Sequence, residues 1–206
     1  MVGAVLSVAF LLSDAGDPLQ AAIDRYRDIA GYEVTIKSAG GGKLEILRYY
    51  FRKPGHVRME FVTPFNGAVL IYSPVTRQAR LWPFGRHRFP ALTLSPENRL
   101  IRSSSGQRVD RSDVGTLFEN VKTLRGHGNT EIGDIETVGS RETRRVTVVA
   151  NGFSIDGVAS YLLWLDLASG FPAKVMSYDS GGRLIESVEM QDLVIDPEFS
   201  SDLFEP

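Results

Sequence analysis

The chain has 206 residues, and its 23 Lys and Arg nearly balance 25 Asp and Glu, which leaves a formal net charge of −2. That balance excludes a general nucleic-acid binder, and the apolar and charged fractions are ordinary for a globular protein. The length allows one domain with a sizeable core. Cysteine is absent, so disulfides, thiolate metal sites and cysteine nucleophiles are excluded.

An apolar run over residues 2–12, followed by Ser13-Asp14-Ala15, opens the chain. The run is too short to span a bilayer, but it has the length of a signal-peptide hydrophobic region with cleavage after Ala15. No Lys or Arg precedes it, so a hydrophobic N-terminal strand is the alternative. We expect residues 1–15 to be a signal peptide and residues 16–206 to be a single exported domain without a membrane-spanning segment.

Two segments have helical periodicity. Residues 18–30 place apolar side chains at spacings of three and four, with Asp17 as the N-cap, Pro18 in the first turn and Gly31 as the stop. Residues 112–124 show a second apolar helical face. We therefore expect one N-terminal helix and one helix in the middle of the chain.

The rest of the sequence alternates with period two, as half-buried strands require. Residues 84–111 lack either period, so we expect mostly loop there. The closing part forms three strands joined by short Gly-, Ser- and Asp-rich turns, which is typical of an antiparallel meander. About ten strands are expected, in a curved antiparallel sheet of a mainly β (α+β) fold: residues 31–37, 43–53, 56–62, 68–72, 78–83, 130–138, 142–150, 161–167, 171–178 and 183–195.

The strand at residues 161–167 is apolar on both faces, whereas a half-exposed antiparallel strand is apolar on one. Two interpretations remain open. The strand is a central one covered by a helix on one side and a loop on the other, or one of its faces lines a ligand cavity.

Several short motifs recur in a recognisable order. Gly31-Tyr32 follows the first helix, and Arg52-Lys53-Pro54 ends a long strand. Leu81-Trp82-Pro83-Phe84 forms an aromatic region, and Ser169-Gly170-Phe171-Pro172 and Asp179-Ser180-Gly181-Gly182 mark the turns of the closing meander. This order resembles that of the LolA-like proteins, the periplasmic lipoprotein carriers of Gram-negative bacteria and their relatives.

The resemblance implies an unclosed β-barrel whose concave face is apolar and covered by helices, with acyl chains held between sheet and helices. In the carriers, an Arg directly before the Pro is implicated in closing the lid helices. Lys53 stands at that place here and Arg52 precedes it, so both are candidates for lid contact. The alternation of apolar and polar residues does not show which face is concave. The candidate cavity residues that it gives are Val34, Ile36, Val57, Met59, Phe61, Leu70, Leu162, Trp164, Val175 and Val188.

No constellation predicts an enzyme. His56, His87 and His127 have no helical metal-ligand spacing, and neither a P-loop nor a Gly-x-Ser-x-Gly motif occurs. We expect no catalytic residues, no metal and no cofactor. A hydrolase of the cell envelope is the third and least supported reading, because the sequence nominates no nucleophile for it.

The charges are unevenly distributed along the chain. Residues 77–111 contain eight arginines against two acids, and residues 179–206 contain eight acids against Arg183. Either the two regions neutralise each other across the sheet, or a basic rim steers anionic headgroups or an acidic partner surface.

The resemblance implies a soluble periplasmic carrier of lipid or lipoprotein acyl chains in lipoprotein sorting or lipid transfer. The absence of a lipidated cysteine favours a carrier over a membrane-anchored acceptor. An inner-membrane transporter or an outer-membrane acceptor is the implied protein partner, and nucleic acid is not. The alternative is an envelope sensor or interaction module, as in the N-terminal half of RseB-type regulators.

Overall fold

The computed structural model describes residues 16–205, which form one continuous antiparallel sheet of 11 strands with two α-helices. The strand order is β6-β5-β4-β3-β2-β1-β11-β10-β9-β8-β7. The predicted signal peptide lies outside the described residues. The strands are β1 (Gly31–Gly40), β2 (Lys43–Arg52), β3 (His56–Thr63), β4 (Val69–Ser73), β5 (Gln78–Trp82), β6 (Leu92–Leu94), β7 (Gly128–Val138), β8 (Arg141–Ala150), β9 (Ser160–Asp166), β10 (Pro172–Tyr178) and β11 (Leu184–Ile195).

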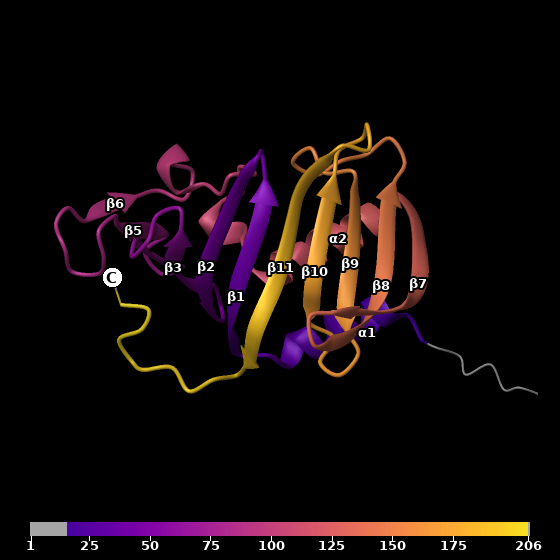
Figure 1. Ribbon diagram of the computed structural model, residues 1–206, viewed down its shortest axis with the longest axis horizontal. Coiled ribbons are helices and arrows are strands. Elements are labelled where there is room, and N and C mark those ends of the chain that lie inside the picture. Colours follow the sequence, from indigo (N-terminus) through magenta and orange to yellow (C-terminus); the bar gives the residue numbers. More distant parts are fainter. Residues whose placement is uncertain (1–15, 206) are drawn as a thin grey trace, which may run out of the picture.

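The two helices lie where the apolar periodicity predicts them. Helix α1 (Pro18–Asp28) begins at Asp17, whose Oδ1 accepts hydrogen bonds from the N–H groups of Leu19 and Gln20. Helix α2 (Val114–Arg125) begins at Asp113, whose carboxylate caps the first turn. Both helices lie behind the same face of the sheet, where they contact β7, β8 and β9 (Figure 1).

The sheet consists of two meanders joined edge to edge. Strands β1–β6 follow one another on one side, strands β7–β11 follow one another on the other, and β1 pairs with β11 between them. Because β6 and β7 do not pair with each other, the sheet stays open. The predicted α+β fold with an unclosed, curved antiparallel sheet and a closing meander is confirmed. The prediction missed β6, a strand of three residues in a region expected to be loop.

One face of the sheet, here called the inner face, carries most of the core. Tyr32, Tyr49 and Phe51 from β1 and β2 and Leu163 from β9 belong to the same buried cluster as Phe118 of α2. The turn between β9 and β10 lies close to α1. A Cβ added to Gly170 would lie only 3.1 Å from the Cα of Ala22. Gly170 also has φ +73°, which glycine adopts without strain. The core is therefore a layer between the inner face and the helices.

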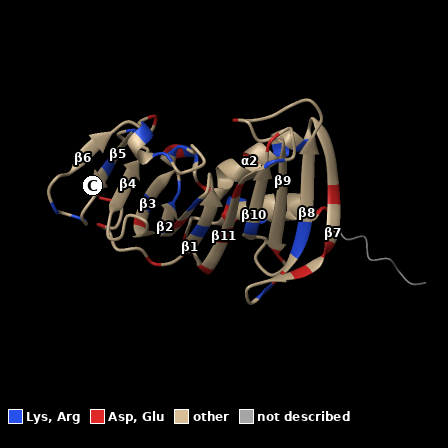
Figure 2. Ribbon diagram, turned by 45° about the horizontal axis from the view of Figure 1, so that its top comes forward, with Lys and Arg blue, Asp and Glu red and all other residues tan. Residues whose placement is uncertain are grey.

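Charged residues occur on most strands of the sheet (Figure 2), and on β2 and β3 the paired Arg48 and Glu60 lie on the opposite, outer face. A second, smaller apolar cluster of Val69, Ile71 and Trp82 lies on β4 and β5. The C-terminal residues 196–205 run from the end of β11 across β2 and β3 towards the β5–β6 loop (Figure 1). Phe204 is buried there, with the guanidinium of Arg52 above its ring at 4.7 Å.

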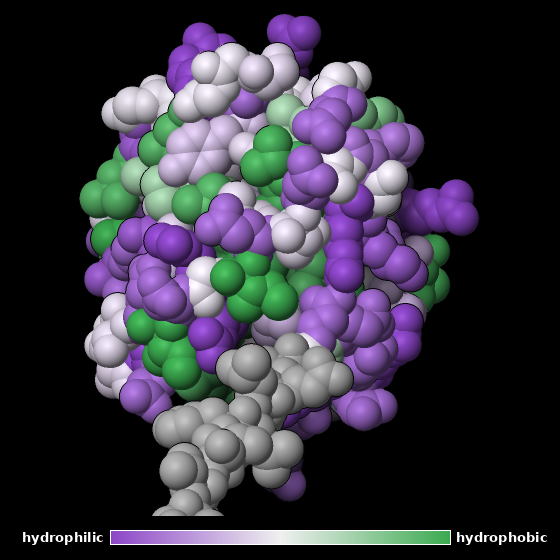
Figure 3. Space-filling model, turned by 90° about the vertical axis from the view of Figure 1, so that its right-hand side faces the viewer, coloured by the Kyte–Doolittle hydropathy of each residue, from purple (hydrophilic) through white to green (hydrophobic). Residues whose placement is uncertain are grey.

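The free edge of β7 shows a mixed surface in which hydrophobic and hydrophilic groups alternate (Figure 3). Ile132 and Ile135 are half exposed, and Glu131 and Asp134 lie beside them on the same strand. A bulge interrupts the pairing of β7 with β8 between these two isoleucines. Charges and bulges of this kind discourage edge-to-edge strand pairing.

Candidate functional site

A row of large apolar side chains crosses the inner face from strand to strand. The register pairs Val34 with Tyr49, Tyr49 with Met59, Met59 with Leu70, and Leu70 with Leu81. Since directly paired residues lie on the same face of a sheet, the row is continuous from β1 to β5. The apolar row thus continues beyond β7, β8 and β9, the strands with which the two helices make most of their sheet contacts.

The segment between β6 and α2, residues 95–113, covers this part of the inner face and is called the cover segment. Its Ile101 and Val109 are buried in the main core cluster. Met59, Phe61, Leu81 and Leu94 beneath it are only partly buried, however. The cover is therefore incomplete, and the apolar surface of β3–β6 remains partly open.

The structure divides the sequence-predicted cavity residues between the two faces. Those that pack in or against the main core cluster, and so lie on the inner face, are Val34, Ile36, Val57, Met59, Phe61, Leu70, Val175 and Val188. Leu162 and Trp164 point to the outer face, because their partners on β10 are Met176 and Lys174. Trp164 is covered there by polar groups, since its indole N–H donates to Glu136 at 2.7 Å. The helix-facing residues of β9 are their neighbours Tyr161, Leu163 and Leu165.

Three tyrosine hydroxyls fasten the start of α2 to the rest of the fold. Tyr32 Oη accepts a hydrogen bond from the N–H of Val114 at 3.1 Å, and Tyr49 Oη lies 2.9 Å from Ser112 Oγ. Tyr26 Oη of α1 donates to Asp113 Oδ1 at 3.3 Å. Burial raises the pKa of all three tyrosines, so each stays a neutral hydrogen-bonding group.

This tyrosine cluster is a feature that sequence reasoning missed. Tyr32 and Tyr49 occupy positions on the apolar face of their strands, so the alternation pattern predicts only that they are core residues. The sequence did contain one signal for the cluster, the N-cap residue Asp113. It marks the start of a helix, and a helix start buried in an apolar layer needs hydrogen-bond partners for its unpaired N–H groups.

The side chains of Lys53 and Arg52, the two predicted lid contacts, lie on opposite faces of the sheet. Lys53 Nζ donates to the carbonyl oxygens of Tyr26 and Arg27 at the end of α1. Arg52 lies on the outer face against Phe204. The two residues are therefore not part of one contact, and Lys53 is the one that reaches a helix.

A carboxylate holds the other part of the cover segment. Glu186 of β11 accepts from Ser38 Oγ at 2.5 Å and from Ser105 Oγ at 3.0 Å. Glu45 lies close by on β2, and burial together with the charge of Glu186 raises its pKa. The cover segment is thus held by Ser105 to Glu186 and by Ser112 to Tyr49, two side-chain contacts that are separate from the hydrogen bonds between the strands.

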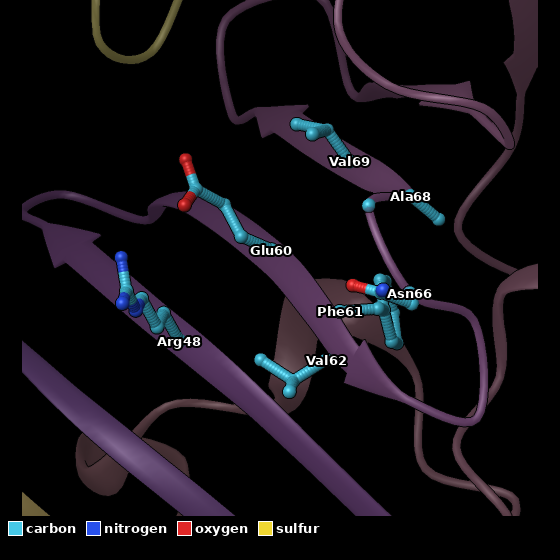
Figure 4. A pocket seen from close by; sticks show the side chains of 8 residues that line it. Arg48, Glu60, Phe61, Val62, Asn66, Ala68 and Val69 are labelled. Atoms are coloured by element: carbon cyan, nitrogen blue, oxygen red, sulfur yellow. The ribbon is translucent and has the colours of Figure 1, made fainter.

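Two shallow hollows lie at loop ends of the sheet. One, of about 280 Å³, lies on β2–β4 and is lined by Arg48, Glu60, Phe61 and Asn66 among others (Figure 4). The other, of about 400 Å³, lies at the β1–β2 hairpin beside Leu184 and Ile185. The space between helices and sheet is filled by side chains such as Val121, Leu124 and Val146, which have no exposed surface. This arrangement, in which side chains fill the space between the helices and the sheet, is called the closed state.

The histidines are dispersed rather than clustered. His56 packs against Phe204, His87 against Trp82, and His127 stacks on Phe153 at 4.0 Å. Within residues 16–205, no group of three or more His, Cys, Asp or Glu side chains is placed to hold a metal ion. In the same part of the chain, neither helix has the length and hydropathy needed to cross a bilayer.

No protein-family model matches the sequence, and no curated protein matches it. Solved structures do match. An uncharacterized conserved protein from Thermus thermophilus has 10% identity and a TM-score of 0.57, over 92% of this chain and 94% of that one. MucB has 17% identity and a TM-score of 0.54, over 94% of this chain and 62% of its own. A LolA superfamily protein from Nitrosomonas europaea has 12% identity and a TM-score of 0.42, over 91% and 97%.

At these identities the likeness shows the fold and leaves the function open. The match to MucB extends along nearly all of this chain, which spans less than two thirds of MucB. An open antiparallel sheet with helices on one face is the architecture that the sequence motifs predicted. The chain shares its fold with the Thermus thermophilus protein and with MucB.

Proposed function

We propose that the protein is a periplasmic carrier that holds acyl chains of lipids or lipoproteins between the inner face of its sheet and the helices. No reaction is involved. Binding requires the cover segment and helices to move outward, because side chains fill the space beneath them in the closed state. Among the predicted cavity residues, the proposal keeps those on the inner face and leaves out Leu162 and Trp164.

One observation supports this proposal most directly. The apolar row of the inner face continues beyond the helices onto β3–β6, where Met59, Phe61, Leu81 and Leu94 are only partly buried. An acyl chain that covered these residues would remove apolar surface from water on both sides. Each methylene group so buried contributes about 0.8 kcal/mol. A surface of this kind suits mobile hydrocarbon, which needs no fixed hydrogen bonds.

The means of opening also follow from the contacts. The cover segment is held by the Ser105–Glu186 and Ser112–Tyr49 hydrogen bonds, and the start of α2 by Tyr26 and Tyr32. Each hydrogen bond of this type contributes about 0.5–1.5 kcal/mol net. The free energy lost when these few hydrogen bonds open can be offset by the burial of several methylene groups.

Native mass spectrometry of the exported protein, purified from a bacterial periplasm without detergent, tests the proposal. We expect additional mass that extracts into organic solvent as lipid. An apo mass, together with no displacement of a fluorescent fatty-acid probe, would contradict it. That result would favour the alternative, an interaction module that binds a protein partner, and a pull-down would then have to return that partner in stoichiometric amount.

A pair of substitutions localises the binding surface. Met59→Trp places a bulky ring on the partly open inner face, whereas Met176→Trp places the same ring at a half-buried position of the outer face. We expect Met59→Trp to reduce uptake of the fatty-acid probe and Met176→Trp to leave it unchanged, with both variants folded by circular dichroism. Equal uptake by the two variants would exclude the inner face of β3 as the binding surface.

A further inference from the structure

Two loops at one end of strands β3–β6 present aromatic side chains to solvent. They are residues 64–68, between β3 and β4, and residues 83–91, between β5 and β6, and are called the docking loops. Phe65 is 62% exposed, Phe84 63% and Phe89 93%. Single exposed apolar residues are ordinary on a protein surface, but a group of large ones marks an interaction site.

The docking loops lie against each other and are well supported. A Cβ on Gly85 would lie 3.6 Å from the carbonyl oxygen of Gly67, so the two turns are adjacent. Backbone hydrogen bonds close both turns, from Ala68 to Phe65 at 2.9 Å and from Arg88 to Gly85 at 3.0 Å. The outer-face cluster of Val69, Ile71 and Trp82, with Ala91 packed on it, lies directly beneath. The phenylalanines thus stand on turns that are closed by backbone hydrogen bonds and that adjoin a buried apolar cluster.

The charge at this end of the sheet is positive. The docking loops contain Arg86, His87 and Arg88 and no Asp or Glu, and basic residues mark the β5–β6 loop (Figure 2). Asp202 of the C-terminal tail pairs with Arg86 at 3.3 Å, whereas His87 and Arg88 are exposed.

The hollow beside the docking loops adds another basic residue. Arg48 lines it together with Asn66, and the side chain of Arg48 is exposed (Figure 4). The carboxylate that also lines this hollow, Glu60, is bound by the guanidinium of Arg58 at 2.7 Å. Arg48 and Arg88 are therefore exposed cations at the end of the strands that carries the exposed phenylalanines.

We propose that the docking loops bind the surface of an anionic lipid bilayer. Phenylalanine side chains enter the boundary between headgroups and acyl chains, while Arg and Lys contact lipid phosphates. A bilayer accepts several separate phenylalanines at once, whereas a protein partner would need a matching recess for each. This inference goes beyond the proposed function, since it concerns the surface that the protein visits and not the cargo that it holds.

The docking loops lie next to the inner face of the sheet, so bilayer binding would bring that face close to the membrane. Phe65 packs edge-on against Phe61, with ring centroids 6.3 Å apart, and Phe61 belongs to the inner face. Binding through Phe65 would place the partly open apolar surface of β3 next to the bilayer. Acyl chains could then pass between membrane and protein with little exposure to water.

The absence of cysteine allows a direct test by labelling one site. Phe65→Cys carries an environment-sensitive dye in a docking loop, and Val75→Cys carries the same dye in the β4–β5 loop at the other end of the strands, where Val75 is 82% exposed. With vesicles of phosphatidylethanolamine and phosphatidylglycerol, we expect a blue shift of the dye at position 65 and none at position 75. The same response at both positions, or none at position 65, would overturn the proposal.

Co-sedimentation of the full chain with the same vesicles gives a second readout. The double variant Phe65→Ser, Phe89→Ser should reduce the partition coefficient by about tenfold or more, and Val75→Ser should not change it. Arg88→Gln should weaken binding at low salt only, because salt screens exposed charges. Loss with Arg88→Gln alone, together with competition by an acidic peptide, would instead indicate a protein partner and overturn the bilayer proposal.

The fatty-acid probe separates this proposal from the proposed function. The docking-loop variants should take up the probe as the unchanged protein does. Loss of vesicle binding with intact probe uptake supports docking at these loops. Intact vesicle binding in a protein that never takes up the probe would contradict the carrier function and leave the docking surface standing.

Discussion

Lys53 Nζ donates a hydrogen bond to the backbone carbonyl oxygen of Arg27 at 2.7 Å, so the residue after β2 caps the end of α1. A second bond reaches the carbonyl of Tyr26 at 3.2 Å, and the ammonium lies 5.4 Å from the centre of the Tyr26 ring. A cation at a helix C-terminus also interacts favourably with the helix dipole. One flexible side chain thereby links the sheet to the helix that the proposed function requires to move.

Replacing Lys53 with Met should therefore loosen α1 without disturbing the sheet. We expect the free energy of unfolding to fall by about 1 kcal/mol, and uptake of the fatty-acid probe to become faster because the closed state is weakened. Urea titration and stopped-flow fluorescence measure the two effects. Lys53→Arg should restore both, since a guanidinium can reach the same carbonyl oxygens.

Arg52→Met is the matched control for that prediction. Arg52 lies against Phe204 on the outer face, so its loss should affect the C-terminal tail and leave probe uptake unchanged. If Arg52→Met accelerated uptake as much as Lys53→Met, the contact between Lys53 and α1 would not be the one that controls opening.

Tyr32→Phe and Tyr49→Phe should differ in their cost, although each removes one buried hydroxyl. Tyr32 Oη accepts from the N–H of Val114 in the first turn of α2, and its loss leaves that buried donor unpaired. Ser112 Oγ, the partner of Tyr49, keeps a second bond to the carbonyl of Val109 at 2.8 Å.

We therefore expect Tyr32→Phe to cost about 1–3 kcal/mol and Tyr49→Phe about 0.5–1.5 kcal/mol of unfolding free energy. Urea titrations of the two variants measure the difference. A larger loss for Tyr49→Phe would mean that Ser112, and not the start of α2, is the anchored point.

Most of the fold could be predicted from local patterns. Period-two alternation located the long strands, and Asp17-Pro18 located the start of α1, because these signals act within a few residues. β6 was missed because its three residues are too few to show alternation. β6 forms because it pairs with β5, and a local sequence pattern carries no information on that pairing.

The candidate site could be predicted only in part, and the reason is geometric. Alternation separates Leu162 and Trp164 from Leu163 but does not say which set faces the helices. On β9, charged side chains cover the outer set, as Lys174 and Glu136 do for Trp164. Long charged side chains can cover apolar groups with their stems, so an apolar residue on the outer face needs no cavity.

Glu45 should make the closed state sensitive to pH. Burial and the nearby Glu186 raise its pKa above the ordinary value of 4.5, so the folded protein holds the proton more tightly than the unfolded chain. The resulting stability is fully present below pH 4.5 and is lost as the pH rises through the higher pKa of the folded state. At neutral pH, the ionised Glu45 disfavours the fold.

Glu45→Gln should consequently raise the unfolding free energy at pH 7 and change it little at pH 4. Urea titrations at the two pH values give the comparison. Glu33→Gln, on the exterior of the neighbouring strand β1, is a suitable control for loss of one carboxylate. Destabilisation by Glu45→Gln at pH 7 would show that the ionised form makes a favourable contact with the cover segment.

His56 should make the C-terminal tail sensitive to mild acid. Its ring packs edge-on against Phe204, with ring centroids 5.9 Å apart, and the neighbouring Arg58 donates to the carbonyl of Leu203 at 3.0 Å. Burial, and then the charge of Arg52, lower the pKa of His56 below its ordinary value of 6.5. The stability that comes from the neutral ring is present above pH 6.5 and is lost as the pH falls through the lower pKa of the folded state.

His56→Phe keeps an aromatic ring against Phe204 but cannot be protonated. We expect this variant to lose less stability between pH 7 and pH 5 than the unchanged protein, and to protect the amide hydrogens of the tail from exchange at pH 5. His127→Phe, at the junction of α2 and β7, controls for the loss of a histidine elsewhere. If the two variants lost stability in parallel over this range, protonation of His56 would not be what releases the tail, and Asp202, the carboxylate that pairs with Arg86, would have to be tested next.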